Sequence, residues 1–210
     1  MKTLIAVPCM DQLPARFAQS LATLRLVGDC AVSFQIGSLV YNSRNELAKR
    51  AIKMDADYVL WLDSDMIFEP DLLERMHARM AEDNLDFLTG LCFRRTHPYT
   101  PALFDKLEYK KGVVLWTDYA NRLIPNAPFE VAACGFAGVL MKTEVIMSVQ
   151  AKHNDMFTPM NRTGEDLSFC WRARDCGFRI VCDPSIELGH LGYTVITREF
   201  YETYTATAKK

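Results

Sequence analysis

The segment that most constrains the fold is residues 57–62, whose central run Tyr-Val-Leu-Trp-Leu is apolar at every position. A strand with one face in water alternates apolar and polar residues, so this run predicts a strand that is covered on both faces, as in a parallel sheet. Further apolar runs predict strands at 3–7, 31–40 and 85–89. A sheet built from such strands needs helices on both of its sides.

Apolar residues between these strands recur at helical spacing. The spacing predicts helices over 12–26, after the N-cap candidates Asn42 and Ser43, and from about Pro70, which suits the first turn of a helix. Alternation of strand and helix is typical of a mostly parallel sheet with right-handed crossovers. We therefore expect an α/β fold.

The alternation of predicted strands and helices ends after Gly90. Residues 103–116 predict a hairpin that turns at 110–112, and residues 129–141 contain two strand-like runs broken at Gly135. A helix is expected over 165–175, ended by Gly177, with a strand at 178–182. The low glycine content of the tail suggests ordered structure that acts as a lid or a partner-binding arm.

Composition excludes several classes of protein. The chain has 210 residues, 50% of them hydrophobic and 24% charged, which suits one globular domain rather than a disordered chain. A net charge of −2 argues against a general nucleic-acid binder. The seven cysteines form no Cys-x-x-Cys pair, so we expect reduced core thiols rather than a zinc site. With no signal-peptide pattern or apolar run of membrane-spanning length, a soluble cytoplasmic protein is expected.

The strongest chemical signal is Asp63-Ser64-Asp65, which directly follows the predicted central strand. In an extended segment, residues i and i+2 point to the same side, so both carboxylates would face one spot. That spot lies at the C-terminal edge of the sheet, where open α/β folds bind ligands. Paired carboxylates there suit Mg²⁺ or Mn²⁺ held together with substrate phosphates. The alternative is that Asp63 caps a turn and Asp65 is merely solvated.

Three motifs then carry a family resemblance: Asn42-Ser-Arg-Asn45 with the segment from Tyr58 to Met66, then residues 134–141, then residues 164–179. In this order they resemble glycosyltransferases of the A fold, and most closely the inverting family 2. The resemblance covers about residues 3–190. It implies a glycosyltransferase-A-type, Rossmann-like sandwich in one domain, with a mostly parallel central sheet and a mixed C-terminal half.

The resemblance also divides the chain. Residues 1–92 would form the nucleotide-sugar-binding half, about 93–190 the acceptor and catalytic half, and 191–210 the tail or lid. In the first half, Asp65 would be the more direct metal ligand, and Asp63 would reach the metal through water or the donor ribose. His190 occupies the place where the family often has a third ligand; its alternative is a buried, hydrogen-bonded histidine.

The resemblance makes Asp166 the catalytic base and lets Glu165 orient donor or acceptor. A base of this kind removes the acceptor hydroxyl proton as the new bond forms. Two forces oppose each other at Asp166: the helix N-terminus stabilises its anion, whereas Glu165 disfavours a second charge. The sequence leaves open which prevails. The alternative for both residues is ordinary first-turn acidity of a helix.

Other residues would contact the donor. One of Arg94 and Arg95 is expected to face solvent, and the alternative for Arg44 is a solvated helix face. The family's uracil-binding aspartate is missing at Gln35-Ile-Gly-Ser38, which leaves the donor base unassigned. The predicted donor-contacting residues, besides Asp63, are Pro8, Asp11, Arg44, Arg94, Gly135 and Gly138.

The predicted function is a Mn²⁺- or Mg²⁺-dependent, inverting glycosyltransferase of hexosyltransferase type. It would move a sugar from a nucleoside-diphosphate sugar to an acceptor hydroxyl. The alternatives are an inactive nucleotide-sugar-binding or scaffolding module, a metal-dependent phosphodiesterase, and a sugar-1-phosphate nucleotidyltransferase, which the glycine-free segment 8–14 disfavours. The donor sugar and the oligomeric state stay open. The acceptor could be soluble, lipid-linked, a protein or a modified nucleic-acid base.

Overall fold

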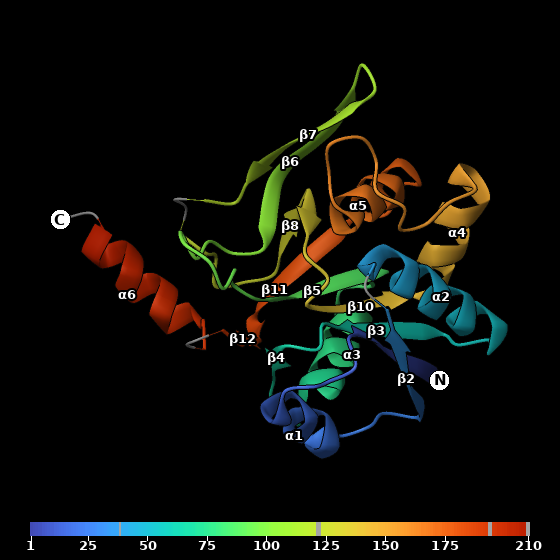
Figure 1. Ribbon diagram of the computed structural model, residues 1–210, viewed down its shortest axis with the longest axis horizontal. Coiled ribbons are helices and arrows are strands. Elements are labelled where there is room, and N and C mark those ends of the chain that lie inside the picture. The colour runs from blue at the N-terminus through green and yellow to red at the C-terminus, as the bar shows by residue number, and fades with distance from the viewer. Residues whose placement is uncertain (38, 121–122, 193–194, 209–210) are drawn as a thin grey trace.

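The centre of the structure, a computed structural model, is a seven-stranded sheet (Figure 1). The structure describes every residue except 38, 121–122, 193–194 and 209–210. Strands β2, β1, β3, β5 and β11 run parallel, whereas β10 and β8 run antiparallel to their neighbours. The spatial order is β2 (Asp29–Ile36), β1 (Lys2–Cys9), β3 (Tyr58–Leu62), β10 (Gly138–Lys142), β5 (Phe87–Leu91), β11 (Ile180–Glu187) and β8 (Phe129–Val131). The predicted α/β fold with a mostly parallel sheet and a mixed C-terminal part is confirmed.

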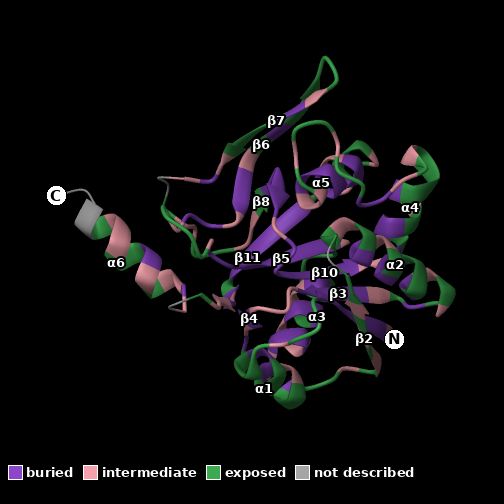
Figure 2. Ribbon diagram, viewed as in Figure 1, coloured by how far each residue is buried: buried purple, intermediate pink, exposed green. Residues whose placement is uncertain are grey.

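Helices cover both faces of this sheet (Figure 1). Successive residues of β3 alternate between two separate cores, with Val59 and Trp61 on one face and Leu60 and Leu62 on the other. The first core receives α2 (Val40–Lys53), α4 (Thr143–His153) and α5 (Glu165–Asp175), and the second receives α1 (Ala15–Thr23) and α3 (Leu72–Glu82). Figure 2 shows the buried residues concentrated along the central strands.

Two small sheets complete the fold. One joins β7 (Val113–Asp118), β6 (Leu103–Lys110) and β9 (Ala133–Cys134), and the other pairs β12 (Gly189–His190) with β4 (Met66–Ile67). The β6–β7 hairpin turns where predicted, at Lys111 and Gly112, which both have positive φ (53° and 80°). It projects from the body of the molecule (Figure 1), and its outer part is exposed (Figure 2).

Helix α2 begins earlier than predicted. Its N-cap is Leu39, whose carbonyl accepts hydrogen bonds from the backbone N–H groups of Asn42 and Ser43. Those two residues therefore lie in the first helical turn, and the prediction that they cap the helix is wrong. The consequence for the site is that Arg44 sits one turn into the helix on its buried face.

The sequence analysis omitted α4 and shortened β11. It expected ordered structure in the tail, where α6 (Arg198–Ala208) forms, while 193–194 and 209–210 lie outside the described residues. All seven cysteines are free, and most are buried, as expected. Within the described residues, no helix has the length and apolar character needed to cross a membrane.

Candidate active site

The chain turns sharply where β3 ends. The N–H of Met66 donates to the carbonyl of Asp63 at 3.3 Å, so residues 63–65 form a turn and not the extended segment that the sequence suggested. Both carboxylates still reach one place. They line a cleft of about 260 Å³ at the C-terminal end of the parallel strands, whose walls include Pro8, Gly37, Arg44, Asp63, Asp65 and Glu165. We call this the carboxylate cleft.

Arg44 connects the two acidic motifs. Its side chain is 2% exposed, with Nη2 2.7 Å from Asp63 Oδ1 and Nε 3.4 Å from Glu165 Oε1. Its guanidinium carbon lies over the Phe136 ring, 5.0 Å from the centroid. Although burial lowers it, the pKa of Arg44 is raised overall by the surrounding carboxylates, so the cation is retained. A solvated position on the helix is therefore excluded, and Arg44 Nη1 is buried without a hydrogen-bond partner among the described residues.

Asp65 and His190 meet although they are far apart in sequence. The pairing of β12 with β4 sets His190 opposite Met66, and His190 Nε2 lies 3.3 Å from Asp65 Oδ2. His190 Nδ1 is 2.9 Å from the Phe93 carbonyl, so it carries the proton and donates there. Arg95 Nη1 also lies 2.6 Å from Asp65 Oδ2. Burial alone would raise the pKa of Asp65, but the neighbouring His190 and Arg95 lower it.

Leu188 fixes the approach of the chain to His190. An added Cβ on Gly90 would come within 2.6 Å of the Leu188 side chain, and one on Gly138 within 2.5 Å. The two glycines lie on the adjacent strands β5 and β10, so together they make room for Leu188. This packing explains Gly138 without a ligand, and its predicted contact with the donor stays a prediction.

Glu165 and Asp166 begin helix α5, directly after its N-cap Gly164. Burial and the adjacent Glu165 outweigh the N–H of Leu167 and raise the pKa of Asp166 to about 6. The question that the sequence left open is thus resolved in favour of a weaker acid. An added Cβ on Gly164 would lie 2.9 Å from Asp166 Oδ1, so glycine leaves room for the carboxylate.

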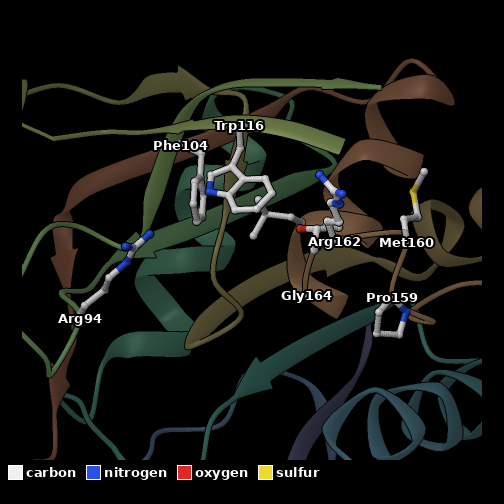
Figure 3. A pocket seen from close by; sticks show the side chains of 9 residues that line it. Arg94, Phe104, Trp116, Pro159, Met160, Arg162 and Gly164 are labelled. Carbon is white, nitrogen blue, oxygen red and sulfur yellow. The ribbon is translucent and has the colours of Figure 1, made fainter. Parts of the chain in front are cut away.

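A second pocket adjoins this motif, since Gly164 and Leu167 contribute to its wall. It measures about 660 Å³ and takes walls from Arg94, Phe104, Trp116, Met160, Arg162 and Gly164 (Figure 3). Arg94 is held there by Asp118, with Nη2–Oδ1 and Nη1–Oδ2 distances of 2.7 and 3.2 Å. We call it the hairpin pocket, because Phe104 and Trp116 belong to β6 and β7.

The structure thus gathers most of the predicted site residues and separates a few. Asp63, Asp65, Glu165, Pro8 and Arg44 line the carboxylate cleft, and His190 reaches it through Asp65. Asp166 lies beside Gly164 and 3.9 Å from where a Cβ on Gly135 would be. Asp11 is exposed and is not part of the cleft wall, and Arg94 lines the hairpin pocket instead.

Sequence analysis missed two residues of the hairpin pocket, Trp116 and Arg162. Trp116 is 44% exposed, and Arg162 has a φ of 66°, a backbone conformation that is uncommon outside glycine. A tryptophan within a predicted hairpin strand is a weak signal that could have marked the first. Nothing in the sequence marks the second, because its place depends on the fold of the loop before α5.

The architecture defines the class: this is an α/β protein of the glycosyltransferase-A fold. Residues 39–140 match the sequence model of the family described as Glycosyl transferase family 2, and this segment is a domain of that family. The predicted family resemblance is confirmed. No curated protein matches the chain.

Three solved structures show the same fold. A197 from STIV superposes with a TM-score of 0.65 at 18% identity, over 91% of this chain and 86% of that one. GalNAc-T7, solved with UDP, GalNAc and Mn²⁺, gives 0.61 at 10% identity, over 91% of this chain and 43% of that one. TarS 1-349 of S. aureus gives 0.50 at 17% identity, over 82% and 55%. The chain therefore spans less than half of the GalNAc-T7 chain and about half of the TarS fragment.

Proposed function

We propose that this protein is a metal-dependent, inverting glycosyltransferase that moves a sugar from a nucleoside-diphosphate sugar to an acceptor hydroxyl. One observation carries the proposal. The buried Arg44 contacts both Asp63, at the end of β3, and Glu165, at the start of α5. Two acidic motifs about a hundred residues apart thus face one cleft, at the sheet edge where α/β folds bind nucleotides.

The residues at this cleft fit a divalent cation. His190 donates through Nδ1 to Phe93, and its Nε2 faces Asp65 Oδ2 at 3.3 Å, so these two atoms would be the ones to hold a metal. The described residues contain no group of three or more acidic, histidine or cysteine side chains set to hold an ion. Mg²⁺ and Mn²⁺ bind through one or two protein ligands together with substrate phosphates. Asp65 and His190 would hold the cation, with Asp63 acting through water or the ribose.

Asp166 would act as the base. In a single displacement, the acceptor oxygen bonds to the anomeric carbon as the bond from that carbon to the phosphate oxygen breaks. The hydroxyl proton passes to Asp166, and the nucleoside diphosphate leaves with the electron pair. A divalent cation, when bound, offsets the charge that develops on this leaving group. A carboxyl group with a pKa of about 6 is ionised at neutral pH yet basic enough to take the proton.

Two neighbours support this role. Glu165 shares the cleft with Asp63 and Asp65 and would orient the donor or acceptor hydroxyls. Arg44 offsets the repulsion between the acidic residues. Pro8 and Gly37 form the opposite wall, where the base and ribose of the donor would lie.

The proposal is tested by release of nucleoside diphosphate from a panel of UDP-, GDP-, dTDP- and ADP-sugars with Mn²⁺ or Mg²⁺. Thermal shift with the same panel reports binding separately, since a ligand of the folded state raises its apparent stability. We expect nucleotide sugars with one of these bases to bind, and water to cleave the sugar from them slowly. Asp166→Asn should keep binding and lose cleavage, and Asp65→Asn should lose the metal-dependent part of both.

The alternatives give different outcomes in this experiment. Binding of a nucleotide sugar without release of its diphosphate would identify an inactive module. Release of pyrophosphate from a nucleoside triphosphate and a sugar 1-phosphate would identify a nucleotidyltransferase. Equal cleavage by the wild-type protein and Asp166→Asn would remove Asp166 from the mechanism.

A further inference from the structure

The hairpin pocket and the carboxylate cleft are both lined by residues at the start of α5. Glu165 lines the cleft, whereas its neighbours Gly164 and Leu167 line the pocket. The Asp166 carboxylate lies close to the pocket wall, because a Cβ on Gly164 would be 2.9 Å from its Oδ1. The pocket is thus separated from the proposed base by the small residue Gly164.

Trp116 gives this pocket an open aromatic surface. It is 44% exposed, whereas Phe104 in the same wall is 5% exposed. The C–H groups on the apolar face of a pyranose ring carry a slight positive charge, and the face of an indole ring is negative. Among the described residues of this pocket, Trp116 thus presents the one broad ring face on which a sugar could lie. A volume of about 660 Å³ has room for a sugar of one or two rings.

The two arginines of the pocket differ. Arg94 is tied to both carboxylate oxygens of Asp118. The ion pairs of the described residues include none to Arg162, which is exposed in the pocket wall. Figure 3 shows the two guanidinium groups on opposite sides of the Trp116 ring in this view. A positive charge beside the ring therefore has no counterion within the described structure.

The backbone at Arg162 adds an independent observation. Its φ is 66°, in the left-handed region, and the N–H of Thr163 donates to the carbonyl of Met160 at 3.1 Å to close the turn. Glycine is the usual residue at such a turn position, and side chains held there are common at ligand-binding loops. An arginine at this position costs some stability relative to glycine, and the turn holds its side chain in the pocket wall.

We propose that the hairpin pocket binds the acceptor, and that the acceptor is an anionic saccharide. Its ring lies on Trp116, and its carboxylate or phosphate group pairs with Arg162. This inference rests on the proposed function and assigns the acceptor class that the cleft itself does not determine. A guanidinium group binds either a carboxylate or a phosphate through paired hydrogen bonds. The test therefore includes a saccharide with each of these groups.

The test measures binding at Trp116 by the NMR signal of its indole N–H, assigned with Trp116→Phe. The probes are methyl β-D-glucopyranosiduronate, methyl β-D-glucopyranoside and the 6-phosphate of the latter, with a nucleoside 5′-monophosphate as the rival ligand. We expect saturable shifts with the uronate or the phosphate and at least five-fold weaker binding of the neutral glycoside. Which of the two anions binds more tightly distinguishes a uronic acid from a phosphosugar.

Variants separate this site from general charge effects. Arg162→Gly suits a φ of 66°, so it should fold normally and reduce anionic binding to the level of the neutral glycoside. Lys111→Gly is the matched control, because Lys111 is also an exposed cation with positive φ (53°), at the hairpin tip. It should leave binding unchanged. Trp116→Ala should abolish saccharide binding as measured by titration calorimetry, and Trp116→Phe should restore part of it.

Three results would overturn the inference: no saturable shift with either anionic saccharide, equal affinity for charged and neutral glycosides, or tighter binding of the nucleotide. An equal loss in Lys111→Gly and Arg162→Gly would do the same. The proposed function fails separately. Saccharide binding at Trp116 without cleavage of any nucleotide sugar refutes only the transferase activity, and cleavage without saccharide binding refutes only the acceptor class.

Discussion

The carboxylate cleft and the hairpin pocket are both lined by residues at the start of α5, yet they are built differently. In the cleft, charges are buried and paired with each other: Arg44 is 2% exposed and contacts Asp63 and Glu165. In the pocket, Trp116 is 44% exposed and Arg162 has no ion-pair partner among the described residues. The binding groups of the cleft are therefore buried in the core, whereas Trp116 and Arg162 of the pocket lie on the surface of the protein.

This difference has an energetic consequence. A charge removed from a buried group leaves its partner buried and uncompensated, which destabilises the fold. A side chain removed from an exposed position usually changes stability by little. Substitutions of the buried charges of the cleft should thus alter stability and activity together, whereas substitutions in the pocket wall should leave stability unchanged. Three substitutions test this contrast.

The largest effect is expected for Arg44→Met. Methionine keeps much of the side-chain volume but leaves Asp63 and Glu165 without their buried cation. We expect the free energy of unfolding to fall by roughly 3–5 kcal/mol and nucleotide-sugar cleavage to be lost. Urea denaturation measures the first, and diphosphate release measures the second. Arg50→Met, on the exposed side of the same helix, is the control and should change stability by about 1 kcal/mol or less.

If Arg44→Met were as stable as Arg50→Met, the buried ion pairs of the cleft would not contribute to the free energy of unfolding. The contrast between cleft and pocket would then be lost, whatever happened to activity.

The second prediction concerns Asp166→Asn. Its pKa is raised from 3.8 to about 6 by burial and by Glu165, so the folded state holds its proton more tightly than the unfolded chain. This contribution to stability is full below about pH 4 and is lost between about pH 4 and 6, because over this range the unfolded chain ionises while the folded state keeps its proton; above about pH 6 both states are ionised and the loss is complete. Asparagine removes this cost. We expect the variant to be about 1–3 kcal/mol more stable than the wild type at pH 8, with no such gain near pH 4.

The same substitution should reduce transfer by roughly 10²–10⁴-fold, the usual contribution of a general base. In the wild type, kcat/KM should rise with pH and level off above about pH 6, following ionisation of Asp166. Asp29→Asn, at an exposed position, is the control and should leave both stability and the pH profile unchanged. A destabilised Asp166→Asn variant at pH 8 would contradict the raised pKa.

Local signals explain what the sequence could predict. The helix Glu165–Asp175 was predicted to the residue, because Gly164 and Gly177 bound it on both sides. The hairpin turn at Lys111-Gly112 and the buried strand Tyr58–Leu62 also follow from residues close in the chain. In each case the determining interactions lie within the element or at its ends.

Non-local contacts explain what it could not. The insertion of β10 between β3 and β5 joins strands from distant parts of the chain, and no local pattern specifies it. The Arg44–Glu165 contact spans 121 residues. The same limit applies to Arg94 and Arg95, which are adjacent in sequence: only the structure shows that Arg95 reaches Asp65 while Arg94 pairs with Asp118.

The smallest predicted effect tests how the carboxylate of the proposed base is positioned. Gly164 has a φ of −78°, which alanine adopts without strain, but a Cβ there would lie 2.9 Å from Asp166 Oδ1. We expect Gly164→Ala to keep its stability and to lose roughly 10–100-fold in transfer rate, because the carboxylate must move. Its displacement should also shift the pH at which kcat/KM levels off, which a purely structural effect would not do.

Gly135→Ala is the matched comparison on the other side of the same carboxylate. Its Cβ would lie 3.9 Å from Asp166 Oδ2 and 3.4 Å from Ala102 Cβ, which are ordinary contacts. This variant should therefore lose only a few-fold in rate, which corresponds to less than about 1.4 kcal/mol of activation free energy. If Gly135→Ala lost more activity than Gly164→Ala, the carboxylate would be held from the strand side rather than from the helix N-cap. Gly164 would then not be the residue that determines where the carboxylate lies.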